Sequence, residues 1–291
     1  MRKTLIGVFI TLLMGCGHQP ILLEERGSFL IDRSYSYSTK QDLKSVKFLV
    51  LHYTALDDLD SLRVLTSGQV SAHYVISSRP KYEHNEPIVF QLSSEKEKTW
   101  HAGRSEWQGY QSLNNDSIGV EIVNCGFRTF IKRDVIETEW CEYHPSQIDA
   151  LIRLAKNIIG RYNIEAVNVV GHSDIAPLRK KDPGPVFPWK VLYEHGIGAW
   201  PDPATVSKYL ANRPPDAQVS VAVIQKVLAN YGYSIPQTGY LDDDTRRTIK
   251  AFQMHFRPAD FQGNPDAETE AIALALIEKY KLNLLSTNRY L

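Results

Sequence analysis

Cysteine is scarce, at three in 291 residues, and neither sign of charge is in excess, with 33 basic and 33 acidic side chains. Three cysteines are too few for a fold held together by several disulfides. The even charge balance argues against a nucleic-acid partner, because proteins that bind nucleic acid carry a clear basic excess. A hydrophobic content of 43% with 23% charged residues excludes disorder and is ordinary for globular proteins. The length indicates about two domains.

Long apolar runs are also missing, and the one at the N-terminus, residues 5–14, is too short to span a bilayer. Arg2 and Lys3 precede it, which is the layout of a secretory signal. The run ends in LMGC, which resembles the lipobox of bacterial lipoproteins. The resemblance implies a signal peptide over residues 1–16, lipidation of Cys16 with acyl chains such as palmitate, and anchoring to a membrane. Gly17 after the cysteine implies the outer membrane, facing the periplasm. An ordinary signal with a chance cysteine is the alternative.

Export changes the interpretation of the two remaining cysteines, Cys125 and Cys141, because disulfides form in oxidising compartments. A bridge between them would close a loop of about 16 residues and contribute roughly 3 kcal/mol in the chain-entropy model. Two separate buried thiols are the alternative, since sequence spacing does not show that the Cα atoms are close enough.

The middle of the chain alternates between strand and helix patterns. Apolar runs predict strands, and an amphipathic pattern predicts a helix over about 148–162. Asp57 and Asp58 are suited to capping a second, shorter helix that ends near Gly68. This alternation is typical of an α/β layer structure. The predicted strands lie at 46–53, 73–76, 88–92, 118–123 and 167–170.

A change of pattern follows the Arg-Pro-Pro-Asp segment at 213–216, because paired prolines stop both helices and strands. Beyond it, the pattern predicts three short helices, which would form a small independent bundle over 217–281. Asp242 and Asp244 at first resemble a calcium loop. The sixth position is Arg247 instead of glycine and the twelfth is Gln253 instead of glutamate, so we exclude a calcium site.

Two histidines and an aspartate stand where a catalytic metal site would need them. His52 and His172 each follow the C-terminal end of a predicted strand, the region where α/β sheets bind ligands. Asp182 lies in a Pro-Gly loop ten residues after His172. Two histidines and one carboxylate, with a fourth position left to water, are the ligands of a catalytic zinc. Spacing alone does not establish the site, because single histidines are more often structural than metal ligands.

A series of ordered motifs resembles one family. The motifs are VLHYTA at 50–55, SAHY at 71–74, WHAG at 100–103, SIGVE at 117–121, GHSDIAP at 171–177, RKKDPG at 179–184 and FPW at 187–189. Together they resemble the zinc-dependent N-acetylmuramoyl-L-alanine amidases, which share their fold with the peptidoglycan recognition proteins. The resemblance implies an amidase domain over 46–212, preceded by a tether at 17–45. It also implies an α/β fold with a mixed central sheet flanked by helices, followed by the small three-helix bundle.

The resemblance assigns the site residue by residue. His52, His172 and Asp182 would bind one catalytic zinc. Glu121 would be the acid–base group, because the phage branch of the family carries a tyrosine where this chain has Ala72. Lys180, two residues before the aspartate ligand, would stabilise the oxyanion.

Three further residues are candidates for substrate binding: Trp100, His101 and His73. His101 would line the substrate groove, whereas His73 would do so or serve as a core histidine. The segment 217–281 resembles peptidoglycan-binding domains, and a plain bundle that contacts the amidase domain is the alternative.

The predicted function is hydrolysis of the amide bond between N-acetylmuramic acid and L-alanine in peptidoglycan and muropeptides, by a monomer. One alternative is a peptidoglycan receptor without activity, but such receptors usually lack the third zinc ligand, and Asp182 is present. Another is a zinc peptidase, although no His-Glu-x-x-His motif occurs. A purely structural tether would need neither His52 nor Asp182.

Overall fold

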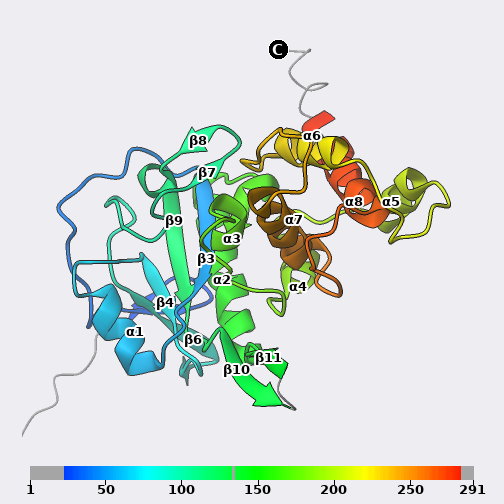
Figure 1. Ribbon diagram of the computed structural model, residues 1–291. Helices are drawn as coiled ribbons and strands as arrows, with labels where there is room; N and C mark the ends of the chain where they lie inside the picture. The colour runs from blue at the N-terminus through cyan, green and yellow to red at the C-terminus, as the bar shows by residue number, and fades with distance from the viewer. Residues whose placement is uncertain (1–22, 133–134, 283–291) are drawn as a thin grey trace, which may run out of the picture.

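The structure is a computed structural model that describes residues 23–132 and 135–282. The predicted signal peptide and Cys16 therefore lie outside the described residues. Figure 1 shows an α/β part that contains the central sheet, and a group of helices beside it formed by the C-terminal third of the chain. None of the helices in the described ranges has the length and apolar character that a membrane span requires.

The centre of the molecule is a mixed sheet of eight strands, which confirms the predicted fold class. β3 lies between β9 and β12 and is parallel to both, while β4 joins β9 in parallel and β6 antiparallel. The sheet order is β1 (Glu24–Glu25), β2 (Leu30–Asp32), β6 (Glu86–Gln91), β4 (Tyr74–Ile76), β9 (Ser117–Ile122), β3 (Phe48–Tyr53) and β12 (Val169–Gly171), with β5 (Tyr82–Glu83) paired to β6.

The two faces of this sheet are covered differently. Leu49 and Leu51 of β3 pack against the buried side of α2 (Pro145–Tyr162), the long amphipathic helix that the sequence predicts. Phe48 and Val50 point the other way and belong to a cluster that includes C-terminal helices. Since successive side chains of a strand alternate between faces, His52 shares the second face with Phe48 and Val50. The strand pattern therefore directs His52 away from α2.

Shorter elements surround the sheet. Two hairpins leave it, and the base of the longer one is closed by a disulfide between Cys125 and Cys141, whose Cα atoms are 5.9 Å apart. The structure thus contains the bridge between these two cysteines, which their spacing in the sequence did not decide. The elements are the helices α1 (Asp58–Leu65), α3 (His172–Ile175) and α4 (Trp189–Glu194), the hairpin β7 (Glu106–Trp107) and β8 (Tyr110–Gln111), and the hairpin β10 (Phe127–Lys132) and β11 (Val135–Trp140).

The C-terminal helices pack on one another and on the α/β part. The three predicted helices are α6 (Val221–Tyr231), α7 (Asp243–Phe256) and α8 (Ala267–Ile277), and α5 (Pro203–Leu210) also packs against α8. The bundle is not independent, because its core is continuous with the α/β part. Trp107 of β7 contacts the rings of Tyr231 and Tyr233 at centroid distances of 5.9 and 4.9 Å.

Candidate active site

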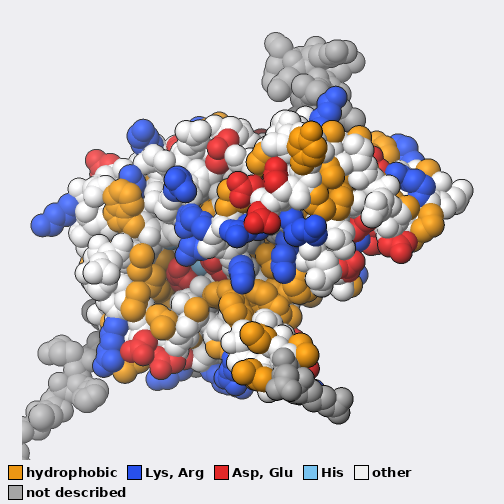
Figure 2. Space-filling view, viewed as in Figure 1, with side chains coloured by type: hydrophobic (Ala, Val, Ile, Leu, Met, Phe, Trp, Pro, Cys, Tyr) orange, Lys and Arg blue, Asp and Glu red, His pale blue; other side chains and the backbone are white. Residues whose placement is uncertain are grey.

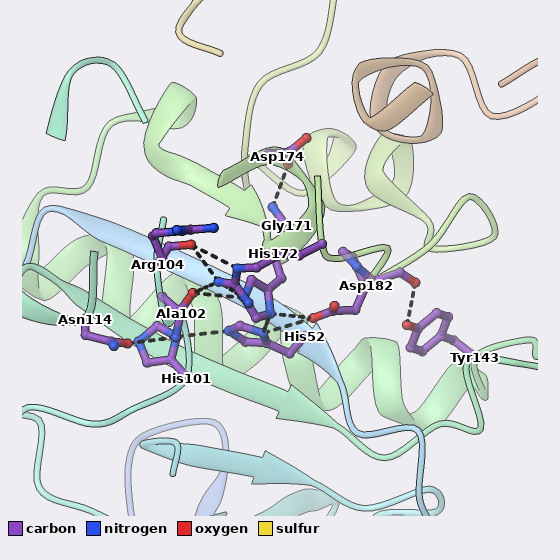
Figure 3. Close-up of polar contacts among 12 residues, drawn as sticks. His52, His101, Ala102, Arg104, Asn114, Tyr143, Gly171, His172, Asp174 and Asp182 are labelled. Carbon is purple, nitrogen blue, oxygen red and sulfur yellow. Dashed lines mark hydrogen bonds and ion pairs between the residues drawn. The ribbon is translucent and has the colours of Figure 1, made fainter. Parts of the chain in front are cut away.

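Three buried side chains meet at the C-terminal ends of β3 and β12. His52 lies near the end of β3, His172 opens α3 directly after β12, and Asp182 lies in the loop between α3 and α4. The Nδ1 atoms of the two histidines are 2.9 Å apart, and they lie 3.1 and 3.0 Å from Asp182 Oδ2. Figure 3 shows the three side chains pointing toward one another. The structure thus brings together all three predicted metal ligands.

The geometry of this triad fits a zinc ion. A tetrahedral zinc with bonds of about 2.0–2.1 Å holds its ligand atoms about 3.3–3.4 Å apart, close to the spacing observed here. Burial and the facing His172 together lower the pKa of His52 to about 4, although Asp182 opposes the shift. Burial opposes ionisation of Asp182, but the two histidines hold its pKa below the usual range. A neutral imidazole at His52 and an ionised carboxylate at Asp182 suit metal binding.

Two polar groups lie behind His172, on the side of its ring that faces away from the triad. Its Nε2 lies 3.1 Å from the carbonyl oxygen of Ala102. The carbonyl can accept a hydrogen bond from Nε2, but Nη2 of Arg179, which only donates, also lies 3.3 Å from Nε2. When Nε2 carries the proton, the lone pair of His172 Nδ1 faces Asp182 and the centre of the triad.

A relay of hydrogen bonds from the Leu113 carbonyl through Ser117 and His101 fixes the protonated nitrogen of His52. The Ser117 hydroxyl donates to the carbonyl of Leu113 at 2.5 Å, so its oxygen accepts from His101 Nε2 at 3.1 Å. His101 Nδ1 is then an acceptor for His52 Nε2, 3.0 Å away. The proton of His52 stays on Nε2, and its Nδ1 is free to bind a metal. Such outer hydrogen bonds commonly fix the tautomer of metal-binding histidines.

Gly119 makes room for this relay. A Cβ atom at this position would lie 2.4 Å from Cγ of His101. No side chain larger than hydrogen fits there unless the His101 ring moves. The close contact with His101 therefore explains why residue 119 of the SIGVE motif is glycine. Gly119 lies two residues from Ser117 and from Glu121 on the same strand.

Glu121 faces the triad from β9, in register with His52 of β3. Its side chain is half-buried, but its Oε2 atom is enclosed and has no hydrogen-bond partner among the described residues. Burial and the Asp182 carboxylate raise the pKa of Glu121 to about 8, whereas Lys180 lowers it. Glu121, Lys180, His172 and Asp182 all line one cavity of about 220 Å³. A carboxyl group and an ammonium group thus accompany the triad.

The predicted substrate-binding residues separate into two groups. Trp100 and His101 line the same cavity, with Trp100 43% exposed at its surface. His73 does not line it. Its Nε2 donates to the carbonyl of Glu97 at 2.9 Å, and its Nδ1 accepts from the amide of Gly119 at 3.0 Å. The structure places His73 in the core, where backbone groups satisfy both ring nitrogens.

The loop that carries His172 is held by residues that sequence reasoning did not assign to the site. Asp174 accepts hydrogen bonds from the Gly171 amide at 2.7 Å, from the hydroxyl of Tyr233, and from His255 Nδ1 at 2.8 Å. The His255 ring stacks on Trp189 at a centroid distance of 3.8 Å. The C-terminal helices therefore support the metal-site loop. His255 gave no signal in the sequence, because its partner lies 81 positions away.

Two known protein families match the two parts of this chain. Residues 42–185 match the family of N-acetylmuramoyl-L-alanine amidases, and residues 218–272 match a peptidoglycan binding domain family. The chain is 45% identical over 273 residues to the N-acetylmuramoyl-L-alanine amidase AmiD of Escherichia coli (strain K12), covering 92% of this chain and 95% of the relative. The chain belongs to the N-acetylmuramoyl-L-alanine amidase family.

Solved structures of members of the amidase family match over most of the chain. A complex of AmiD from E. coli with anhydro-N-acetylmuramic acid-L-Ala-D-γ-Glu-L-Lys aligns with a TM-score of 0.76 and 45% identity, covering 89% of this chain and 98% of that one. AmpDH3 from Pseudomonas aeruginosa in complex with an anhydromuramic pentapeptide aligns with a TM-score of 0.71 and 44% identity, covering 85% and 96%. Both alignments extend beyond the amidase domain and confirm the fold over the 85–89% of the chain that they cover.

Proposed function

We propose that this chain hydrolyses the amide bond between N-acetylmuramic acid and L-alanine of peptidoglycan and muropeptides, with one zinc ion held by His52, His172 and Asp182. The observation that carries this proposal is the buried triad beside a cavity that Glu121 and Lys180 line together with His172 and Asp182. The substrate bound to AmiD and the anhydromuramic pentapeptide bound to AmpDH3 support the inclusion of 1,6-anhydro muropeptides.

The metal, Glu121 and Lys180 would each have a chemical task. When bound, zinc lowers the pKa of a coordinated water to about 7 and polarises the substrate carbonyl. Glu121 accepts the proton of the attacking water and passes it to the departing amine of L-alanine. Such a proton transfer contributes about 10²–10⁴-fold. Lys180 places its ammonium group near the oxygen on which negative charge develops.

We also propose that the chain is a monomeric outer-membrane lipoprotein, anchored through Cys16 and facing the periplasm. The lipobox-like motif supports the anchor, and the Cys125–Cys141 disulfide is in keeping with an oxidising compartment. In cells fed labelled palmitate, we expect the wild type to carry label and fractionate with outer membranes. The Cys16→Ala variant should carry none, and an unlabelled wild type would refute the anchor.

For the C-terminal block, the match to the peptidoglycan binding domain family supports a role in holding the enzyme on the cell wall. We propose that residues 218–272 bind peptidoglycan. Co-sedimentation of zinc-free protein with intact sacculi tests this without turnover. Loss of sedimentation is expected when exposed side chains of this block, such as Tyr240, are replaced in combination. Sedimentation that depends only on the catalytic cavity would contradict it.

The decisive experiment for the activity is mass spectrometry of digested muropeptides. The protein is assayed as purified, after chelation, and after zinc is restored. We expect free stem peptides that begin with L-alanine, lost on chelation and regained with zinc. Uncleaved muropeptides despite bound zinc would favour a receptor, and cuts within the stem would identify a peptidase.

A further inference from the structure

We propose that a second cavity, between the loop before Asp182 and helix α7, binds the carboxylates of the stem peptide. The C-terminal block would then take part directly in choosing the substrate. This inference rests on the proposed amidase function and names the part of the substrate that the second cavity recognises.

The second cavity has a volume of about 430 Å³ and is strongly basic. Five of its eight lining residues are cationic. The loop supplies Arg179, Lys180 and Lys181, and α7 supplies Arg247 and Lys250. Figure 2 shows Lys and Arg side chains gathered in the middle of the visible face, beside a hollow in which acidic side chains are seen.

Lys180 connects the two cavities, because it lines both the catalytic cavity and the basic one. A substrate whose scissile amide lies beside His172 and Asp182 can therefore extend past Lys180 toward α7. One arm of the substrate would reach the basic cavity without leaving the protein surface.

Two cations of this cavity interact with carboxylates at a distance, Lys180 with Glu121 and Arg179 with Asp182, but among the described residues the cavity lacks direct charge pairs. Within the described ranges, none of its five cations forms an ion pair with a carboxylate. The guanidinium of Arg179 donates to the carbonyl of Arg104, and that of Arg247 donates to the carbonyl of Leu178. Carbonyl groups hold these side chains in place but leave their charge unpaired.

The two lysines show the same lack of an anion. Lys181 lies over the ring of Phe127 at 4.9 Å, and Lys250 lies over the ring of Phe261 at 5.3 Å. Burial lowers the pKa of Lys250, and the charge of Lys181 lowers it further. Like charges from two separate segments are thus brought together, and a bound anion would relieve their repulsion.

The chemistry of a muropeptide identifies that anion. Its N-acetylated sugars are uncharged, so its carboxylates belong to the stem peptide. A γ-linked glutamate in second position leaves its α-carboxylate free, and the last residue carries another. At about 3.3–3.6 Å per residue, the first of these lies about 7 Å from the scissile bond. The ligand class is therefore an acidic peptide joined to the sugar being released.

Steady-state kinetics on two synthetic substrates tests the inference. One is anhydromuramoyl-L-Ala-D-γ-Glu-L-Lys with free carboxylates, and the other has both carboxylates amidated. In the Arg247→Gln/Lys250→Gln variant, we expect KM for the acidic substrate to rise about tenfold with little change in kcat, because exposed charge pairs contribute about 0.2–1 kcal/mol each. For the amidated substrate, the KM values of variant and wild type should converge.

Two controls separate charge from structural damage. Lys250→Arg with Arg247 intact keeps the charge and should keep KM for the acidic substrate near the wild-type value. Lys156→Gln removes an exposed charge of α2 outside the cavity and should leave the kinetics unchanged. An unchanged KM in the double variant, or an equal rise in KM for both substrates, would overturn the inference.

A binding measurement keeps the test independent of turnover. Calorimetry with chelator-treated protein and the free tripeptide L-Ala-D-γ-Glu-L-Lys should show binding that weakens with salt and with the double substitution. Equal competition by inorganic phosphate would identify a general anion site and overturn the stem-peptide assignment. If wild-type protein with zinc releases no stem peptide, the proposed activity fails, while this binding arm still decides the role of the cavity.

Discussion

At the scale of single residues, Glu121 has the clearest consequence. Its enclosed Oε2 atom lacks a partner among the described residues and lies in the cavity of the triad. Replacing it by glutamine keeps the shape but removes the proton acceptor. We expect Glu121→Gln to lose at least about 10²-fold in kcat while still binding one zinc. Muropeptide cleavage and elemental analysis measure the two quantities. Glu83→Gln, on exposed β5, is the control, and near-wild-type turnover in Glu121→Gln would refute the assigned role.

The Ser117–His101–His52 relay leads to a second prediction. Without the Ser117 hydroxyl, His101 can protonate Nδ1, which turns His52 Nε2 into an acceptor and moves the His52 proton to Nδ1. We expect Ser117→Ala to weaken zinc binding by about 10–100-fold, as lost outer hydrogen bonds typically do. Competition with a chelator measures the affinity, and long-range ¹H–¹⁵N NMR of metal-free protein reports the tautomer.

Ser93→Ala is the matched control, because Ser93 is equally buried but donates to Glu97 Oε2 at 2.9 Å. It should leave both the zinc affinity and the His52 tautomer unchanged. Unaltered tautomers in Ser117→Ala would show that the relay does not position His52.

The site was only partly predictable from the sequence. The strand ends and the Pro-Gly loop already suggested His52, His172 and Asp182, but the resemblance to the amidases was needed to support this set and to select Glu121. The relay could not be predicted, because the direction of each hydrogen bond depends on acceptors such as the Leu113 carbonyl. The same holds for His73, whose core role becomes clear only when the amide of Gly119 is seen to donate to it.

At the scale of secondary-structure elements, the periodicity of hydrophobic residues predicted those helices and strands that bury one regular face. The sequence predicted α2 and β9 to within a few residues of their ends. It did not predict the hairpin of β10 and β11, whose side chains are almost all exposed or half-buried. A strand pair with no buried face has no hydrophobic alternation to detect. The sequence also did not decide whether the disulfide at its base forms, because the sequence separation of two cysteines does not show the distance between them.

That disulfide supports a prediction about the hairpin. Cys125 and Cys141 are 16 positions apart, and a loop of this size contributes about 3 kcal/mol in the chain-entropy model. We expect the Cys125→Ser/Cys141→Ser variant to lose about 2–3 kcal/mol in the free energy of unfolding, measured with urea. Reducing agent should lower the stability of the wild type by the same amount and leave the variant unchanged. Equal stability of oxidised wild type and variant would contradict this.

At the scale of the whole molecule, the Arg-Pro-Pro-Asp segment at 213–216 lies in the loop between α5 and α6, but it did not reveal how the C-terminal helices pack. The sequence predicted an independent bundle, yet one hydrophobic cluster contains Phe48 of the sheet, Trp107 of the hairpin and Phe252 of α7. This packing depends on the fit between surfaces far apart in the chain, which local patterns do not encode. Asp174 adds polar contacts across the same boundary.

The last prediction concerns this boundary. Tyr233→Phe removes the hydroxyl that donates to Asp174 and leaves a buried carboxylate oxygen without that donor, at a cost of about 1–3 kcal/mol. Because Asp174 also accepts from the Gly171 amide next to His172, the zinc affinity should fall together with the stability. Calorimetry of the wild type should show one unfolding transition, and Tyr240→Phe, 76% exposed, is the control. Two separate transitions, or a Tyr233→Phe variant with unchanged zinc affinity, would mean that the C-terminal helices are carried by the amidase domain without supporting its metal site.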